Sequence, residues 1–282
     1  MPYLLKPILV TFAQILLVLG PALGLGLLMH FLSDRIRARA SVLIGHKKYI
    51  YITALGTVVH EASHAFFCLV FAHKITKISF FSPEKDGTLG YVNHSYNKRN
   101  PYQRAGNFFI GSAPVWGGCA VIALCGWLFL PSAMLEPAGE MLAFSNNAST
   151  ADGMEAISGL LASYSAVGRL CFQTVAALFS SGALLGAGFY AFAYLCFCIG
   201  GHMTLSPPDI KGTLDGGVVI MILLYIYNFA TQWVPEVTAA TEWMMSTVAM
   251  IVCAVMMLAL ALNGIGYALL VLTGRLLRRT PA

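Results

Sequence analysis

Three ionisable residues lie within five positions of an otherwise apolar segment, His60, Glu61 and His64 in GTVVHEASHAFFCLV. Two histidines spaced as in H-E-x-x-H project from one helix face and can bind one zinc ion, and the intervening glutamate can take a proton from a water on that ion. The alternative is a hydrogen-bonded histidine pair with a charge-paired glutamate, which leaves costly polar groups in an apolar helix. We therefore predict zinc (Zn²⁺) ligands at His60 and His64 and a catalytic base at Glu61.

A third protein ligand must come from elsewhere in the chain, because catalytic zinc takes three protein ligands and keeps its fourth position for water. The extended motif with a glycine and a third histidine is excluded, since Phe67 and Val70 occupy those positions. Every later glutamate lies in an expected loop or at its edge. The remaining candidates are Asp209, Asp215 and His202.

Asp209 follows Ser206-Pro207-Pro208, a sequence typical of a helix start. An aspartate at this position can simply cap the helix with Ser206. Two prolines at membrane depth, however, are tolerated only where the segment is buried in protein or lines a wet cavity, which a metal site requires. We expect Asp209 to be the third ligand, with Asp215 and His202 as alternatives.

The elements that position these residues are membrane helices. Of the 282 residues, 58% are apolar and 10% charged, against about 25% charged in soluble domains. Apolar runs of about 20 residues can cross a hydrocarbon core of roughly 30 Å. Six such runs lie near residues 7–31, 50–72, 105–130, 178–203, 209–231 and 244–273. We predict an all-α polytopic membrane protein with about six transmembrane helices, forming one integral membrane domain over residues 1–282.

Two segments between these runs are polar. Residues 75–96 carry β-branched and aromatic side chains around the turn sequence SPEKDG, which predicts a small β-hairpin between the second and third spans. The second half of the polar segment 131–168 is consistent with a short interfacial helix. The seven cysteines all lie in apolar runs, where neither a disulfide framework nor a thiolate metal site is expected.

The basic residues favour an orientation with the N-terminus and the active site on the cytoplasmic side of the plasma membrane. That orientation places these residues inside: Lys6, Lys74, Lys77, Lys85, Lys98, Arg99, Arg104, Lys211, Arg275, Arg278 and Arg279. It places Arg35, Arg37, Arg39, Lys47 and Lys48 outside, against the rule. The net charge of +5 is scattered between spans and gives no nucleic-acid patch.

The ordered motifs resemble the site-2 protease family of intramembrane zinc metalloproteases. His60 and His64 match the family's histidine ligands and Glu61 its catalytic glutamate, while residues 111–118 and 206–209 are similar to its two later segments. The resemblance covers about 50–212, extending to 231. The family's last segment usually reads Asn-x-x-Pro and then Leu-Asp-Gly. Here no Asn precedes the prolines, and residues 214–216 lie further on than that spacing allows.

This resemblance implies an intramembrane zinc endopeptidase that cleaves transmembrane or membrane-adjacent polypeptides. It also implies that a strand edge of the hairpin holds substrate in extended form. One alternative is a non-proteolytic membrane protein with a structural, regulatory or transport metal site. Transport is disfavoured, because the ionisable residues cluster in one shallow layer instead of crossing the bilayer. A further alternative is a zinc enzyme that acts on a lipid or another non-peptide substrate.

Overall fold

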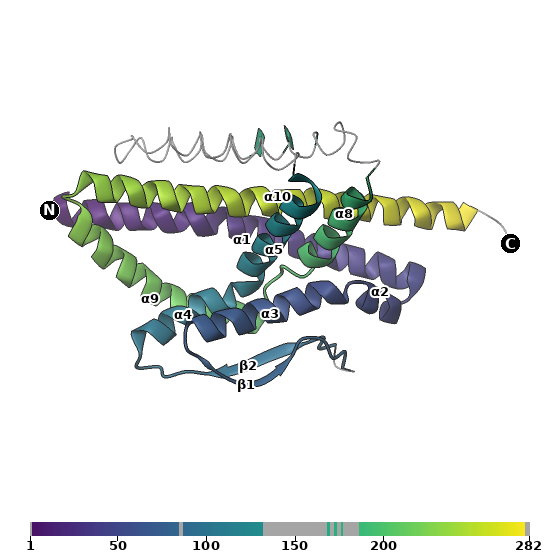
Figure 1. Ribbon diagram of the computed structural model, residues 1–282, viewed down its shortest axis with the longest axis horizontal. Coiled ribbons are helices and arrows are strands. Elements are labelled where there is room, and N and C mark those ends of the chain that lie inside the picture. The colour runs from purple at the N-terminus through teal and green to yellow at the C-terminus, as the bar shows by residue number, and fades with distance from the viewer. Residues whose placement is uncertain are drawn as a thin grey trace.

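Two long helices form one side of the molecule (Figure 1). They are α1 (Pro2–Ile44) and α10 (Pro235–Arg279), which lie side by side. The computed structural model describes residues 2–84, 87–131 and 186–279, with a few isolated positions between 168 and 176. Helices α5 (Ala113–Phe129) and α8 (Ala187–Gly200) connect this pair to α3 (Ala54–Val70), and a β-hairpin lies on the other side of α3.

The number of helices able to cross a membrane is smaller than the sequence suggested. Within the described residues, α1, α9 (Pro207–Thr231) and α10 are long and apolar enough by themselves. Helices α4 (Pro101–Gly111) and α5 make a fourth candidate together, although they are bent by 60° at the break between them. The helical class with a small sheet is confirmed, and these apolar helices support a membrane protein. The count of six spans is wrong.

Local helix breaks explain this difference. The expected span at 50–72 is divided at Thr53, where α2 (His46–Ile52) ends and α3 begins. Thr53 donates its hydroxyl to the carbonyl of Tyr49, which closes that helix. The 17 residues of α3 rise only about 26 Å and the 14 residues of α8 about 21 Å, both short of a bilayer core. The part of the run 178–203 before α8 lies outside the described residues.

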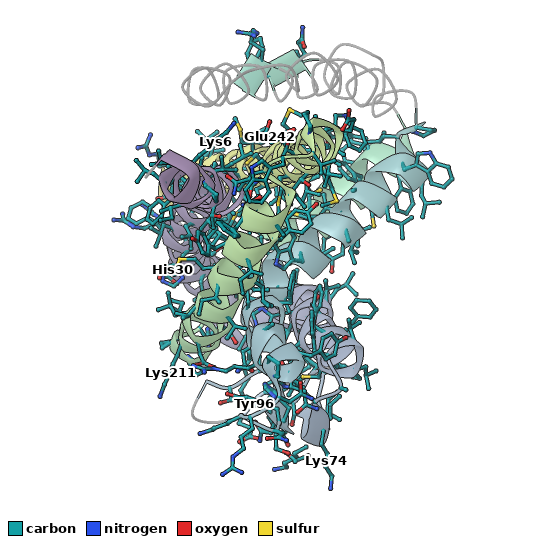
Figure 2. The ribbon with its side chains drawn as sticks, turned by 90° about the vertical axis from the view of Figure 1, so that its left-hand side faces the viewer. Lys6, His30, Lys74, Tyr96, Lys211 and Glu242 are labelled. Carbon is teal, nitrogen blue, oxygen red and sulfur yellow. The ribbon has the colours of Figure 1, made fainter. Side chains whose placement is uncertain are left out.

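The predicted hairpin is confirmed. Strands β1 (Lys74–Ser79) and β2 (Tyr91–Ser95) pair antiparallel, with Ile78 opposite Val92 and an irregularity in the register between Ile75 and Lys77. The hairpin contacts α3 through both strands. Viewed along the long axis in Figure 2, Lys74 and Tyr96 lie at the end of the molecule opposite Lys6 and Glu242. The interfacial helix predicted in the second half of 131–168 falls outside the described residues.

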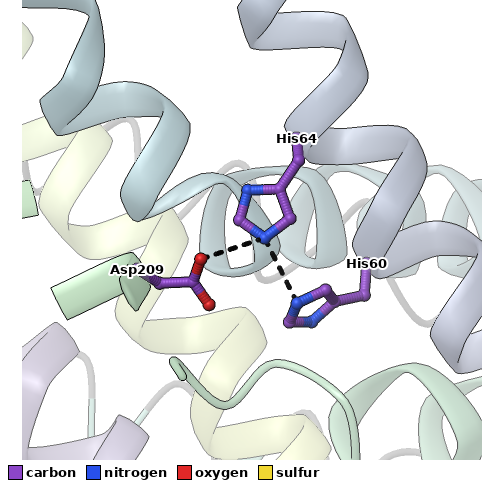
Figure 3. Close-up of side chains that lie close together, drawn as sticks. All are labelled: His60, His64 and Asp209. Atoms are coloured by element: carbon purple, nitrogen blue, oxygen red, sulfur yellow. Dashed lines mark hydrogen bonds and ion pairs between the residues drawn. The ribbon is translucent and has the colours of Figure 1, made fainter. Parts of the chain in front are cut away.

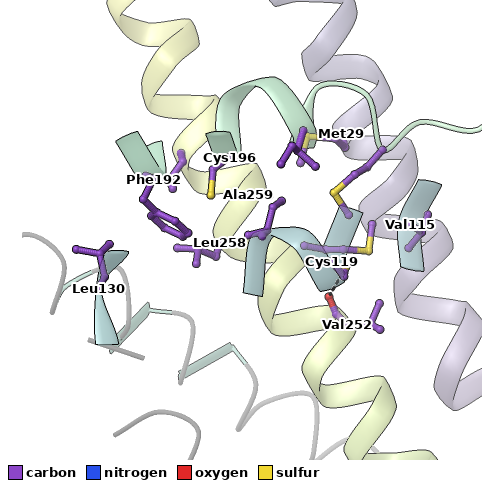
Figure 4. Close-up of a cluster of buried hydrophobic side chains, with 14 of the residues drawn as sticks. Met29, Val115, Cys119, Leu130, Phe192, Cys196, Val252, Leu258 and Ala259 are labelled. Carbon is purple, nitrogen blue, oxygen red and sulfur yellow. Dashed lines mark hydrogen bonds between the residues drawn. The ribbon is translucent and has the colours of Figure 1, made fainter. Parts of the chain in front are cut away.

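The main hydrophobic core lies where α1, α5, α8 and α10 meet (Figure 4). Its side chains include Met29, Cys119, Phe192, Met256 and Ala259, all nearly or fully buried. None of the six cysteines in the described part of the chain is in a disulfide. This core fixes α5 and α8, and through them α3, against the long helix pair.

The long helices α1 and α10 run in the same direction. Leu25 of α1 packs with Met250 and Cys253, whereas Leu43 lies 3.5 Å from where a Cβ on Gly274 would be. The two chain ends therefore lie at opposite ends of the molecule (Figure 1). If both helices cross the membrane, Lys6 and the end of α10 emerge on opposite sides. In that case the sequence-based orientation, which placed both inside, would not hold.

Candidate metal centre

His60 and His64 occupy successive turns of α3 and face the same point (Figure 3). Their Nε2 atoms are 3.2 Å apart, and their rings meet edge to face with centroids separated by 4.9 Å. The spacing of the two residues along one helix produces this geometry directly. Both side chains are largely shielded from solvent, and His64 is 8% exposed.

Backbone carbonyls fix the tautomer of both rings. Nδ1 of His60 lies 2.7 Å from the carbonyl of His202, and Nδ1 of His64 lies 2.7 Å from the carbonyl of Ile110. A carbonyl oxygen only accepts, so in each neutral ring Nδ1 carries the proton and Nε2 presents a lone pair. Two lone pairs then face each other across 3.2 Å with no proton between them. This arrangement favours a shared cation, which would accept both lone pairs.

Asp209 completes the group from the first turn of α9. Its Oδ1 lies 3.4 Å from Nε2 of His64. Its Oδ2 accepts hydrogen bonds from the backbone N–H and the hydroxyl of Ser206, while Ser206 Oγ accepts from the Asp209 N–H. Helix capping and metal binding were alternative interpretations of this residue, but the two oxygens allow both. The capping box orients the carboxylate so that its free oxygen faces the histidines.

Close backbone contacts bring the supporting elements together. A Cβ on Gly56 of α3 would overlap the Cys198 carbonyl and the ring of His202, so α8 can approach closely enough to present the His202 carbonyl to His60 only because position 56 is glycine. Likewise, a Cβ on Gly111 of α4 would overlap the carbonyl of Asp209. Helix α4 thus contacts both α9, at Asp209, and α3, because the carbonyl of the adjacent Ile110 accepts from the ring of His64.

Asp215, the alternative aspartate, has a different set of partners. Its carboxylate accepts hydrogen bonds from Nη2 of Arg104 at 3.0 Å, Nδ2 of Asn107 at 3.0 Å and the hydroxyl of Tyr96 at 3.4 Å. These partners belong to α4 and to the segment after β2. Asp215 therefore ties α9 to α4 and to the segment after the hairpin, about 1.7 turns beyond Asp209. Sequence reasoning gave no role to Arg104, since nothing in the spacing pairs it with a residue 111 positions away.

His202 contributes through its backbone. Its ring Nδ1 lies 2.8 Å from the carbonyl of Cys198, one turn earlier, and its own carbonyl accepts from His60. His202, which sequence analysis considered as a nitrogen ligand, thus orients the ring of the candidate ligand His60 through its backbone carbonyl.

Glu61 lies on α3 beside the hairpin. It is 8% exposed, and its Cγ would be 2.7 Å from a Cβ added to Gly90, the residue before β2. The same Cβ would lie 2.9 Å from the carbonyl of Ser79. Only a glycine at position 90 therefore allows both the end of β1 and the side chain of Glu61 to pack this closely against the backbone there. The hairpin therefore forms part of the wall around the candidate catalytic residue.

A second histidine pair joins the hairpin to the end of α3. Nε2 of His73 contacts the Gln103 carbonyl at 2.8 Å, and its Nδ1 lies 2.9 Å from Nδ1 of His94. The ring of His73 also stacks on Tyr96. Burial lowers the pKa of His73, and burial together with repulsion from His73 lowers the pKa of His94 to about 4. Both rings are therefore neutral near pH 7, and this pair was not anticipated from the sequence.

The three residues expected from the sequence thus come together. Ligand atoms of His60, His64 and Asp209 all lie within 4.8 Å of one another, the one group of this kind found in the described part of the chain. Neither Asp215 nor the ring of His202 belongs to it. Comparisons with models of known protein families, with curated protein sequences and with solved structures gave no match. Functional conclusions consequently depend on the geometry and chemistry of the site.

Proposed function

We propose that this chain is an intramembrane zinc endopeptidase of the site-2 protease type. One observation carries the proposal: two histidine lone pairs and one carboxylate oxygen converge on a single point, and Glu61 follows the first histidine in the same helix. Three converging ligands leave room for a fourth, which is the composition of a catalytic zinc site. A structural site would have four protein ligands, and in the described part of the chain neither the ring of His202 nor Asp215 belongs to the group.

Two of the three distances between ligand atoms fit zinc, and all three ligand atoms lie within 4.8 Å of one another. Ligands about 2.0–2.1 Å from a tetrahedral zinc ion lie roughly 3.3 Å from one another. The separations here are 3.2 Å between the two Nε2 atoms and 3.4 Å between His64 Nε2 and Asp209 Oδ1. The fixed tautomers add to the fit, because a hydrogen-bonded Nδ1 orients the ring and makes Nε2 a better ligand.

Each residue then has a defined role in peptide hydrolysis. Zinc held by His60, His64 and Asp209 would supply a Lewis acid and a water made acidic enough to lose its proton near neutral pH. Glu61 accepts a proton from the attacking water and delivers it to the leaving amine. Its Cγ lies against Gly90 in the hairpin, which limits the positions that the carboxylate can take.

The hairpin supports a polypeptide as substrate. A two-stranded sheet leaves an unpaired edge on each strand, and such an edge can hold an extended peptide by backbone hydrogen bonds. Because the glutamate lies against this hairpin, a peptide paired with it would lie near the candidate catalytic residue. The exposed apolar side chains of α1, α9 and α10 indicate that the substrate meets the enzyme in or beside a lipid bilayer.

We assign the site to the cytoplasmic side of the cell membrane. Four basic residues of the hairpin and the turn after it support this assignment, since basic residues accumulate in cytoplasmic segments. They are Lys74, Lys77, Lys98 and Arg99.

Zinc content of the purified full-length protein tests the ligand set. We expect one zinc per chain in the wild type and none in His60→Ala or Asp209→Ala. Asp215→Asn should retain zinc, with its affinity for zinc lowered by about tenfold. This is the low end of the loss expected for residues that orient ligands without touching the metal. Zinc absent from the wild type, or loss in Asp215→Asn as complete as in Asp209→Ala, would refute this ligand assignment.

Activity is tested with the matched variant Glu61→Gln. Labelled transmembrane peptides are reconstituted with the wild type or the variant, and products are identified by mass spectrometry. We expect cleavage only by the wild type, with zinc equally bound to both proteins. Equal cleavage by both would exclude Glu61 as the base. Bound zinc without cleavage by either protein would favour a non-proteolytic metal site.

A further inference from the structure

Six basic side chains gather at one end of the α1–α10 pair. We call them the basic end: Arg35, Arg37 and Arg39 of α1, Lys47 and Lys48 of α2, and Arg275 of α10. All six are exposed. Asp34 is the one acidic residue in the sequence between positions 32 and 52, and its Oδ1 lies 3.8 Å from Nη2 of Arg37. The basic end therefore carries a large positive charge with little internal neutralisation.

Tertiary packing brings these residues together from opposite ends of the sequence. Ile36, Ala40 and Tyr49 form a buried cluster against which Tyr267 and Leu270 of α10 pack. One turn further on, Leu43 approaches Gly274, the neighbour of Arg275. Figure 1 shows α2 and the C-terminal end of α10 at the same end of the molecule. The parallel course of the two long helices thus gathers the cations at one end.

Exposed apolar side chains surround the basic end. Val42 is 78% exposed, Tyr51 66%, Leu276 66% and Leu277 62%. In addition, Arg35 lies over the ring of Phe31, its Cζ 4.6 Å from the ring centroid. A soluble polyanion such as nucleic acid would match the cations but leave these apolar groups in water. A phospholipid matches both, since it presents an anionic headgroup above acyl chains.

We propose that the basic end binds the headgroups of anionic phospholipids and marks the membrane face where they are enriched. The alternation of cations with exposed apolar side chains gives each headgroup a charged partner and each acyl chain an apolar one. Clusters of four to eight basic residues next to a membrane helix are typical of such binding. The five cations of α1 and α2 that the sequence-based orientation placed outside, against the rule, then bind headgroups together with Arg275. This inference is independent of the metal centre.

Binding of individual lipids to the full-length protein provides the test. The protein in a neutral detergent is titrated with phosphatidylglycerol or phosphatidylcholine, and bound lipids are counted by native mass spectrometry. We expect the wild type to bind phosphatidylglycerol more tightly. The triple variant Arg35→Gln, Arg37→Gln, Arg39→Gln should lose about fivefold in affinity for each charge removed.

A matched control separates the basic end from net charge. Lys74→Gln, Lys77→Gln, Lys98→Gln removes the same number of exposed charges from the hairpin and the turn after it, and should lose much less affinity for phosphatidylglycerol than the first variant. Equal affinity of the wild type for both lipids, or equal losses in the two triple variants, would overturn the proposal. If the first variant unfolds, the double variant Lys47→Gln, Lys48→Gln tests the same surface on α2. Its affinity for phosphatidylglycerol should fall, and its affinity for phosphatidylcholine should not change.

Discussion

At the scale of single residues, Gly90 controls the position of the candidate catalytic base. A methyl group there would lie 2.7 Å from Cγ of Glu61 and 2.9 Å from the Ser79 carbonyl, so the glutamate or the hairpin must shift. We expect Gly90→Ala to retain zinc but to lower the cleavage rate by roughly 100-fold, the cost of a misplacement of about 1 Å at a reacting group. Rates and zinc content are measured on the same preparations.

The matched control for this substitution is Gly264→Ala in α10, where an added Cβ meets nothing within 4 Å. Its cleavage rate should equal that of the wild type. A Gly90→Ala protein with unchanged rate would show that the hairpin does not position Glu61, while loss of zinc would indicate that the substitution disturbs the ligands as well.

At the scale of elements, the His73–His94 pair makes the attachment of the hairpin sensitive to acid. An unfolded histidine titrates near pH 6.5, whereas burial lowers the pKa of His73 and lowers that of His94 to about 4. Between these values the unfolded chain binds more protons than the folded one, so folding stability falls as protons are added. The contribution of the His73–His94 pair to folding stability is complete above about pH 6.5 and is lost progressively as the pH falls toward 4.

Melting temperatures across this pH range measure the effect. The wild type should melt at lower temperature as the pH falls from 6.5 to 4, and His94→Gln should show a smaller decrease. The variant removes one titrating group but can still hydrogen-bond. An identical pH dependence in the two proteins would assign the acid sensitivity to other groups.

At the scale of the whole molecule, the parallel course of α1 and α10 predicts where the termini lie. Each helix, at 43 and 45 residues, is roughly 65 Å long, about twice the thickness of the hydrocarbon core. If both cross the bilayer in the same direction, short epitope tags at the two termini are exposed on opposite sides. Protease protection in sealed, oriented vesicles distinguishes the sides, and protection of both tags together would contradict parallel crossing.

The sequence by itself determined the features that depend on local spacing. His60 and His64 share a helix face because four residues make about one turn, and Ser206 and Asp209 form a capping box because they flank the first turn of a helix. The hairpin followed from alternating β-branched residues around a turn. Each of these depends on contacts between near neighbours in the chain.

Tertiary structure alone decided the remaining features. Asp209 faces the histidines and Asp215 does not, because the contact between Gly111 and Asp209 and the bonds from Arg104 to Asp215 set the rotation of α9 against α4. Carbonyls from other elements decide which nitrogen of each histidine is free. The number of spans and the parallel long helices depend on helix breaks and packing. Contacts between residues far apart in the chain produce these features, and spacing along the sequence does not encode such contacts.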